Sequence, residues 1–356
     1  MSREKYVGMD VHQASTTVVV HDERGKCVME SVIETKAETI RDFLRGVSGS
    51  VHVALEEGTQ AAWLYEIVRP LVGEVIVCDP RANKALMAGN KGDRIDADKI
   101  AQQLRAGLLK PVYHGGHSTR ELKELVHNYD SVVSDSVRVM SRLKALFRGH
   151  GIPCAGRAIY DAKSSDKWLA MISEPGAKSR AGFLYTELSA LKQLRRDSKK
   201  SLLSGSERHQ ATKLLSSIPG IGAVRAAIIV GTVSTPHRFR TRRQFWTYCG
   251  FAVVTRSSSD YRFEGSKLVR DRKRVTTRGL NRNFNRRLKA VFKGAVQQAI
   301  NHEPFKSYWQ QLKARNVSPA IARVSVARKI ASVTLAVWKS SEKFDVEKSR
   351  KIQTIA

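Results

Sequence analysis

Three short β-rich segments, separated by links of only a few residues, open the chain and constrain its fold more than any other feature. Residues 5–11 and 15–21 are joined by a tight link, and the turn at 22–25 leads into residues 26–33. Links this short connect antiparallel neighbours, because a parallel connection needs a crossover of about a dozen residues or more. The sequence therefore predicts that an antiparallel three-stranded meander begins the chain.

The segment that follows alternates between helical and β-rich patterns. The expected helices are 35–46, 60–71, 81–88 and about 96–106, and the expected strands are 51–55 and 74–78. This order predicts two crossover units with parallel strands. Three antiparallel strands followed by two such units form the element order of the ribonuclease H fold, although other α/β domains can also begin with a hairpin. We therefore expect an α/β, ribonuclease H-like domain over residues 1–115.

Helical periodicity dominates the middle of the chain. Residues 120–147 carry apolar side chains at helical spacing without Pro or Gly, and residues 181–203 repeat this pattern. With residues 149–166 as an irregular connection, the two segments predict an antiparallel helical hairpin or a coiled-coil arm over residues 116–205. A plain helical spacer is the alternative.

The last large segment, residues 206–345, is predicted to be a mainly α-helical domain, followed by a tail at 346–356. The sequence from Ile218 to Gly222, IPGIG, resembles a helix–hairpin–helix. Glycines in such a turn let backbone N–H groups approach a phosphate at a helix N-terminus. We expect Gly220 and Gly222 to contact nucleic acid in this way, and a plain interhelical turn is the alternative.

The distribution of charge indicates a polyanionic partner. The chain has 62 Lys and Arg against 33 Asp and Glu, a net charge of +29, although residues 1–110 are nearly neutral. The excess therefore lies after residue 110, and nucleic acid is the partner that it favours. A basic membrane-surface protein is the alternative, but the basic stretches lack a long apolar face for insertion.

The apolar segments and the cysteines indicate the compartment. No apolar run approaches the ~18 residues of a membrane span, and the N-terminus lacks the apolar core of a signal peptide. The four cysteines lie far apart without a CxxC pair, which is typical of a reducing compartment. We therefore expect a cytoplasmic protein without a membrane partner.

The densest positive charge lies in residues 262–293, which hold 12 Lys or Arg against two acids. Apolar and aromatic residues are interleaved with these charges, as in a folded surface. The stretch predicts nucleic-acid affinity with little sequence specificity, and a solvated basic face is the alternative. The expected contacts in and beside it are Arg256, Arg262, Lys267, Arg270, Arg272, Lys273, Arg274, Arg278, Arg282, Arg286 and Arg287.

Carboxylates occupy special places on three elements of the expected N-terminal domain. Asp10 lies inside the first strand, where a lone buried carboxylate is costly. Glu56 and Glu57 end the fourth strand, and Asp93 and Asp96 open the last helix. In a ribonuclease H arrangement these elements meet, and converging carboxylates predict bound Mg²⁺ or Mn²⁺ that assists phosphoryl transfer. Alternatively, acids at a helix start only satisfy free N–H groups.

The choice between the two glutamates stays open at this point. Side chains alternate along a strand, so Glu57 shares a face with Leu55 and Glu56 shares the other face with Ala54. The alternation does not show which of the two faces carries the site.

Several motifs resemble those of the DEDD transposases of bacterial insertion sequences. They are Gly8-Met9-Asp10-Val11, Glu57-Gly58-Thr59 with Trp63, Lys91-x-Asp93-x-x-Asp96-Ala97, IPGIG at 218–222, Arg243-Gln244-Phe245 and the spacing from Gly250 to Ser258. The motifs follow the family's order along nearly the whole chain. The resemblance implies a RuvC-like N-terminal domain, a coiled-coil arm and a C-terminal transposase domain.

The resemblance also implies the roles of individual residues. The catalytic and metal-binding acids carried over from the family are Asp10, Glu57, Asp93 and Asp96. Trp63 lies six residues after Glu57, and this spacing favours Glu57 over Glu56.

The nucleophile that the resemblance implies is Ser258 in the C-terminal domain. The family's serine usually precedes a glycine, whereas Ser259 follows here, so Ser257 is the alternative. The family's Gly-Asn before a Leu-Arg pair is also altered, because residues 278–282 are RGLNR.

The expected function is that of an insertion-sequence transposase. Its serine would attack a backbone phosphate and form a covalent phosphoserine link, assisted by Mg²⁺ at the acids. The partners that the resemblance implies are donor and target DNA, a guide (bridge) RNA and further copies of the chain in a dimer or tetramer, since the serine and acids meet across protomers. A RuvC-like junction nuclease that uses water and a non-catalytic nucleic-acid-binding protein are the alternatives.

Overall fold

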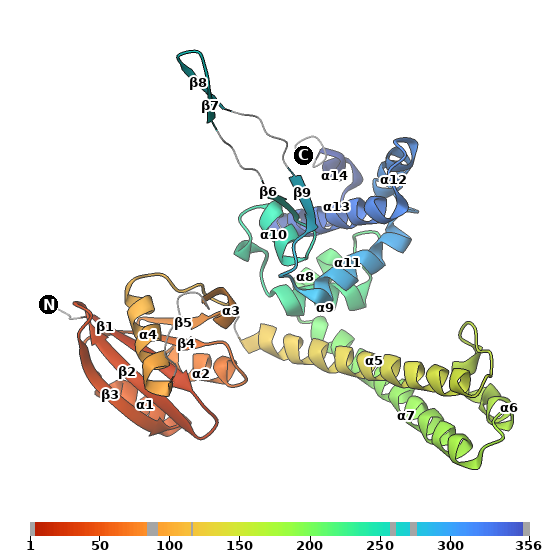
Figure 1. The fold of residues 1–356 in the computed structure, drawn as a ribbon, viewed down its shortest axis with the longest axis horizontal. Helices are drawn as coiled ribbons and strands as arrows, with labels where there is room; N and C mark the ends of the chain where they lie inside the picture. Colours follow the sequence, from red (N-terminus) through yellow and green to blue (C-terminus); the bar gives the residue numbers. More distant parts are fainter. Residues whose placement is uncertain (1–3, 84–91, 115–116, 257–260, 271–275, 352–356) are drawn as a thin grey trace. The chain divides into compact units, whose positions relative to one another are not determined.

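A five-stranded mixed sheet forms the centre of the first of two units, Met1–His114 (Figure 1). The computed structural model describes residues 4–83, 92–114, 117–256, 261–270 and 276–351. The strands are β1 (Glu4–Val11), β2 (Ser15–Asp22), β3 (Cys27–Glu34), β4 (Ser50–Glu56) and β5 (Glu74–Cys78), in the spatial order β3-β2-β1-β4-β5. β2 pairs antiparallel with β1 and β3, whereas β4 pairs parallel with β1 and β5. The predicted meander and both crossover units are confirmed, and this order is consistent with a ribonuclease H-like domain.

Helices cover both faces of this sheet. They are α1 (Ala37–Gly46), α2 (Ala61–Val68), the short α3 (Pro80–Asn83) and α4 (Asp93–Arg105). Met9 of β1 is buried on one face with Leu64 of α2, whereas Ala54 of β4 packs with Ile100 of α4 on the other. The helix expected at 81–88 is described only in its first part, as α3, and the rest of it lies outside the described residues.

Helix α4 lies very close to β1 because Gly8 has no side chain. A Cβ atom at Gly8 would lie 2.1 Å from the carbonyl oxygen of Ala97 and 2.5 Å from the backbone nitrogen of Ala101. Both separations are shorter than non-bonded atoms allow, so this close approach of the two backbones requires glycine.

Two polar contacts fix the start of α4 on the antiparallel strands. Arg94 Nε donates to Glu30 Oε2 of β3 at 2.6 Å, and the buried His21 of β2 has its Nε2 2.7 Å from Asp98 Oδ1. These contacts, with the close approach at Gly8, hold the acids that open α4 beside the carboxyl end of β1.

Two long helices begin the second unit, Gly115–Ala356, and pack side by side (Figure 1). They are α5 (His117–Gly149) and α7 (Pro175–Ser206), connected through the 3-10 helices η1 (Ala158–Tyr160) and η2 (Ala162–Ser164) and the helix α6 (Ser165–Ala170). Phe147 of α5 is buried with Ala181 and Leu184 of α7. Both predicted helices are confirmed and are longer than predicted. Their coiled-coil geometry and a domain boundary at residue 206 stay predictions.

The rest of the second unit is a helical core. Its helices are α8 (Gln210–Leu215), α9 (Ala223–Val233), η3 (Pro236–Arg238), α10 (Arg242–Tyr248), α11 (Arg286–Ala299), α12 (Phe305–Ala314), α13 (Pro319–Ser340) and α14 (Val346–Lys351). Phe245, Phe251 and Phe292 are fully buried in it, and α5 contributes Leu122 and Val126. Among the helices of the described residues, none has the length and apolar character that crossing a bilayer requires.

Four short strands interrupt these helices where the sequence is most basic, and they were not predicted. They are β6 (Val253–Arg256), β7 (Tyr261–Glu264), β8 (Lys267–Arg270) and β9 (Thr276–Leu280). β6 pairs antiparallel with β9, and β7 with β8. Gly265, with φ of +64°, lies in the short turn of the β7–β8 hairpin, and aromatic and β-branched residues favour extended backbone around it. The many Lys and Arg residues conceal the alternation of apolar and polar residues that would otherwise indicate strands in this sequence.

Candidate metal centre and nucleic-acid interface

The register of the sheet determines which acids share a face. In the parallel pairing of β1 with β4, Gly8 lies beside Ala54. Side chains two residues further along each strand point to the same side, so Asp10 and Glu56 share the face that α4 covers. Glu57 lies one residue further and does not share this face. The register thus shows that Glu56, and not Glu57, shares a face of the sheet with Asp10. The alternation of side chains within β4 does not show this on its own.

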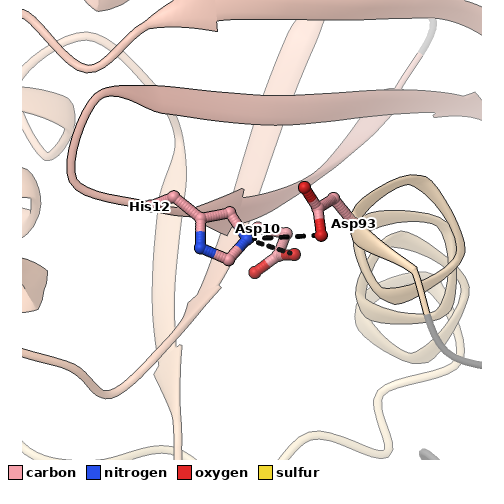
Figure 2. Close-up of side chains that lie close together, drawn as sticks. All are labelled: Asp10, His12 and Asp93. Atoms are coloured by element: carbon pink, nitrogen blue, oxygen red, sulfur yellow. Dashed lines mark ion pairs between the residues drawn. The ribbon is translucent and has the colours of Figure 1, made fainter.

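Asp10, His12 and Asp93 converge where β1 ends and α4 begins (Figure 2). His12 Nε2 lies 3.3 Å from Asp10 Oδ2 and 3.4 Å from Asp93 Oδ1. One possible ligand atom from each of the three side chains lies within 4.8 Å of the other two. The side chains of Asp10 and His12 are 23% and 53% exposed, so a solute can reach this group.

The electrostatics of the site extend to two further acids. Burial raises the pKa of Asp10, His12 opposes this rise, and Asp93 and Asp96 add to it through charge repulsion. Burial also raises the pKa of Glu56, and the charges of Asp10 and Asp96 raise it further. The charges of neighbouring acids therefore disfavour the ionised forms of Asp10 and Glu56, although Asp96 and Glu56 lie outside the compact group around His12.

Glu57 has a different partner. Its Oε2 lies 2.7 Å from Nε2 of His114, whose side chain is only 7% exposed. The His114 ring stacks on Tyr65 of α2, with ring centroids 5.1 Å apart. The resemblance favours Glu57 as the fourth acid, whereas in the structure Glu56 is the glutamate that interacts electrostatically with Asp10 and Asp96.

The donor set fits a hard divalent cation. Neighbouring ligands of octahedral Mg²⁺ lie ~3 Å apart, since each bond is ~2.1 Å long. The separations of 3.3 and 3.4 Å that His12 makes with Asp10 and Asp93 are close to this value. A cation between the carboxylates would also offset the repulsion between Asp10 and its neighbouring acids. Asp10 and Asp93, with Asp96 and Glu56 nearby, are therefore the acids that could hold the ion.

A hollow adjoins the acids at the carboxyl ends of β1 and β4. It has a volume of about 480 Å³ and is lined by His12, Glu56, Thr59, Gln60 and neighbouring apolar residues. This volume lies in the range of ligand pockets and leaves room for part of a substrate beside the carboxylates.

His12 is the site residue that sequence reasoning missed, because it was assigned only to the link between the first two strands. The signal was present: His12 follows Asp10 by two residues, and in extended backbone such residues point to the same side. An Asp-x-His at the end of a strand is therefore a pattern that can form two sides of one site.

The candidate nucleophiles and part of the basic stretch cannot be placed. Ser257 and Ser258 lie outside the described residues, and so do Arg272, Lys273 and Arg274. The predictions made for these five residues stay predictions.

The other basic candidates lie on β6 to β9, on α11 and between them. Arg256 ends β6, Arg262 lies in β7, Lys267 and Arg270 bound β8, and Arg278 lies in β9. Lys267, Arg282 and Arg286 are exposed. Arg287 instead forms an ion pair with Asp130 of α5, so its guanidinium is already engaged within the unit.

The two glycines of the IPGIG turn differ in their surroundings. Gly220 is buried with φ of +83°, and a Cβ atom there would lie 2.5 Å from the carbonyl oxygen of Ala295 in α11. Arg225 reinforces this packing, because it donates to the carbonyl oxygens of Gly220 and Gly294 at 2.8 and 3.0 Å. Gly222 is exposed at the N-terminus of α9, so it is the glycine of this pair that a phosphate could approach.

The β7–β8 hairpin exposes an apolar face. Phe263 pairs with Leu268, and Tyr261 lies two residues from Phe263, so the three side chains share one face of the hairpin. Phe263 is 73% exposed, Leu268 is 57% exposed and Tyr261 is 59% exposed. Large apolar side chains grouped in this way commonly mark a binding surface.

The fold and the acidic site define a class of protein, and comparison with known families identifies it. A family model described as a transposase, of the DEDD type represented by IS110, matches residues 7–152. This stretch contains Asp10, Asp93 and Asp96. A second model, described as a transposase of the IS116/IS110/IS902 family, matches residues 212–310. Together the two matches cover more than half of the chain, which belongs to the IS110 family of DEDD transposases.

Individual relatives agree with this family. The transposase for insertion sequence element IS1111A of Coxiella burnetii is 23% identical over 188 residues, 51% of this chain and 50% of that protein. A putative transposase y4qE of Sinorhizobium fredii is 23% identical over 270 residues, 72% of this chain and 65% of that protein. The uncharacterised 43.6 kDa protein of IS110 from Streptomyces coelicolor is 28% identical over 155 residues, 43% and 35% of the two chains. The chain thus matches between about a third and two thirds of the length of these relatives.

Proposed function

We propose that this chain is the transposase of an insertion sequence and that it cuts and rejoins DNA by phosphoryl transfer at the acidic site of its N-terminal unit. The observation that carries the proposal is the convergence of Asp10 and Asp93, from β1 and α4, with Glu56 of β4 close enough to repel Asp10. Structural acids at helix starts do not require such a group, whereas a metal-dependent phosphoryl transferase does. The family match to DEDD transposases supports the same reading.

The ligands that we propose for Mg²⁺ or Mn²⁺ are Asp10, Asp93, Asp96 and Glu56. When bound, the ion stabilises the negative charge that develops on a phosphate during in-line displacement. The chain itself positions these acids through the close packing of α4 on Gly8. In this proposal Glu57 holds His114 at the end of the unit, and a role of Glu57 as the fourth ligand is the alternative.

The nucleophile that we propose is Ser258, with Ser257 as the alternative. Its Oγ would form a bond to phosphorus, the bond from phosphorus to one DNA oxygen would break, and the serine proton would pass through solvent to that displaced oxygen. The free DNA end carries away the displaced oxygen, and the other end stays linked to the protein. The support for this step is the family resemblance of the sequence from Gly250 to Ser258.

The second unit would supply the affinity for nucleic acid. Its exposed Lys267, Arg282 and Arg286 suit phosphate contacts, and the aromatic face of the hairpin suits stacking on bases. We propose donor and target DNA as its partners, and a guide RNA as the partner that selects them. A dimer or tetramer would bring the serine of one copy to the acids of another.

The covalent intermediate tests this proposal. The substrate is DNA that carries both junctions of the insertion element encoding the chain, incubated with RNA transcribed from the element's flank and with Mg²⁺. Denaturing gels should show a protein–DNA adduct with wild type and none with Ser258→Ala or Asp10→Asn. An adduct on Ser257 would correct the position of the nucleophile. Cleavage without any adduct, retained when both serines are alanine, would instead establish a nuclease that uses water.

A further inference from the structure

We infer that His12 is a nitrogen ligand of the metal centre and that it shifts the preference of the centre from Mg²⁺ towards Mn²⁺. The inference rests on the proposed function, since it concerns the same acidic site. It assigns a role to a residue outside the four acids and predicts a metal selectivity that acids alone would not produce.

The position of the imidazole carries the inference. His12 Nε2 faces carboxylate oxygens from two different elements, Asp10 in β1 at 3.3 Å and Asp93 in α4 at 3.4 Å (Figure 2). An ion that binds both aspartates would therefore have this nitrogen within reach as a further donor. All three donor atoms lie within 4.8 Å of one another, so the nitrogen of His12 could serve as a third ligand.

The backbone of His12 is held in place even though its side chain is half exposed. Its N–H donates to the carbonyl oxygen of Ser15 at 2.9 Å, which closes the turn between β1 and β2. Its own carbonyl oxygen accepts from Thr35 Oγ1 at 2.9 Å. Both backbone groups are thus bonded, and the side chain starts from a fixed point beside the acids. Such preorganisation reduces the entropy lost when a ligand engages its ion.

The charge balance of the site favours a neutral ligand at this place. Asp10 and Asp93 already place two carboxylates beside the His12 ring, and their charges repel one another. A further carboxylate would add to that repulsion, whereas a neutral imidazole completes the coordination without adding negative charge.

The chemistry of the donor determines the selectivity. Mg²⁺ is a hard ion that prefers oxygen and water, whereas imidazole nitrogen binds transition-metal ions more favourably. Removing His12 should therefore weaken the binding of Mn²⁺ much more than the binding of Mg²⁺. If carboxylates alone held the ion, removing His12 would weaken the binding of neither Mn²⁺ nor Mg²⁺.

The test is Mn²⁺ binding to the full chain, followed by electron paramagnetic resonance without DNA. Pulsed spectra of the wild type should show the modulation of a directly bound imidazole ¹⁴N. In His12→Ala this modulation should disappear and the affinity for Mn²⁺ should fall at least ~10-fold, a loss that even indirect partners of a ligand reach. The affinity for Mg²⁺, measured by competition, should change much less. His114→Gln is the matched control, because it removes the other histidine that contacts a candidate acid and should keep the signal.

The outcomes separate this inference from the proposed function. If Mn²⁺ binding depends on Asp10 but the ¹⁴N modulation is absent from wild type, or survives in His12→Ala, the role of His12 is overturned and the acidic centre stands. Equal losses of Mn²⁺ and Mg²⁺ affinity in His12→Ala would overturn the proposed selectivity. If Asp10→Asn binds Mn²⁺ as tightly as wild type does, the metal centre itself is wrong and the inference fails with it.

Discussion

The carboxylate of Glu57 lies 2.7 Å from the imidazole of His114, while Glu56, its neighbour in the chain, is the glutamate whose pKa is raised by burial and by the charges of Asp10 and Asp96. Two adjacent acids at the end of β4 therefore have different partners. One is available to a metal ion, and the other holds the buried His114 that ends the N-terminal unit.

This division predicts different effects of two matched substitutions. Glu56→Gln should reduce DNA cleavage by on the order of 10²-fold or more, the scale on which electrostatic groups act in catalysis, and should weaken Mn²⁺ binding. Glu57→Gln keeps a hydrogen-bond acceptor for His114 and should retain most of the cleavage activity and most of the affinity for Mn²⁺. Cleavage rates and Mn²⁺ titrations of the two variants measure this, and the reverse ranking would show that Glu57 is the fourth ligand.

The raised pKa values of Asp10 and Glu56 predict how stability depends on pH. The folded chain binds protons at the Asp10 and Glu56 carboxyls more tightly than the unfolded chain does, so protonation of these groups stabilises the fold. This stabilisation is fully present below the unfolded carboxyl pKa of about 4. It is lost as the pH rises through the higher folded values. Other carboxylates titrate in the same range, so the informative quantity is the difference in Tm between wild type and Asp10→Asn.

Without metal, Asp10→Asn should melt a few degrees above wild type at pH 7, and the difference should vanish near pH 4. Excess Mg²⁺ or Mn²⁺ should raise the Tm of wild type at pH 7 and leave that of the variant nearly unchanged. Thermal melts across this range provide the measurement. Parallel curves for the two proteins, with and without metal, would show that folding does not raise the pKa of Asp10 and that no ion binds there.

The packing of α4 predicts the effect of one added methyl group. Gly8→Ala places a Cβ atom 2.1 Å from the Ala97 carbonyl oxygen, so α4 must move away from β1. We expect a destabilisation of about 1–3 kcal/mol, with loss of Mn²⁺ binding because Asp93 moves with the helix. Gly46→Ala is the control, since nothing lies within 4 Å of a Cβ atom there. Normal Mn²⁺ affinity in a folded Gly8→Ala protein would contradict the proposed positioning.

The β7–β8 hairpin predicts two separable contributions to nucleic-acid binding. Replacing Tyr261 and Phe263 with Ser should weaken binding to single-stranded oligonucleotides by ~1–3 kcal/mol for each stacked base, without changing the salt dependence. Lys267→Gln should instead flatten the salt dependence by about one phosphate contact. Fluorescence anisotropy over a range of salt concentrations distinguishes the two. If the aromatic variant binds normally but no longer self-associates, the exposed face serves contacts between copies of the chain.

Most of the N-terminal fold could be predicted because its short links leave few choices. The tight turns on either side of residues 15–21 force antiparallel pairing, and the alternation after residue 34 forces crossovers. Strands β6 to β9 could not be predicted in the same way. Their alternation is concealed by Lys and Arg, and the pairing of Val253 with Leu280 joins residues far apart in sequence.

The acids were visible in the sequence, but their partners were not. Alternation within β4 separates Glu56 from Glu57, yet only the register against β1 shows that Glu56 shares the face of Asp10. The contact between Glu57 and His114 joins residues 57 positions apart and has no local signal. His12 did have a local signal in the sequence, because it follows Asp10 by two residues.

In our proposal, the acidic group of the N-terminal unit is a metal-dependent DNA-cleaving centre. Its most direct test is single-turnover cleavage of the element's own junction DNA by Asp10→Asn, compared with Asp42→Asn, which removes an acid that is 75% exposed on α1. We predict that Asp42→Asn cleaves like wild type and stops only when EDTA is added. Asp10→Asn should bind the DNA normally and leave it intact. Cleavage by Asp10→Asn at the wild-type rate, or cleavage by wild type in EDTA, would show that the acidic group is not a metal-dependent cleavage centre.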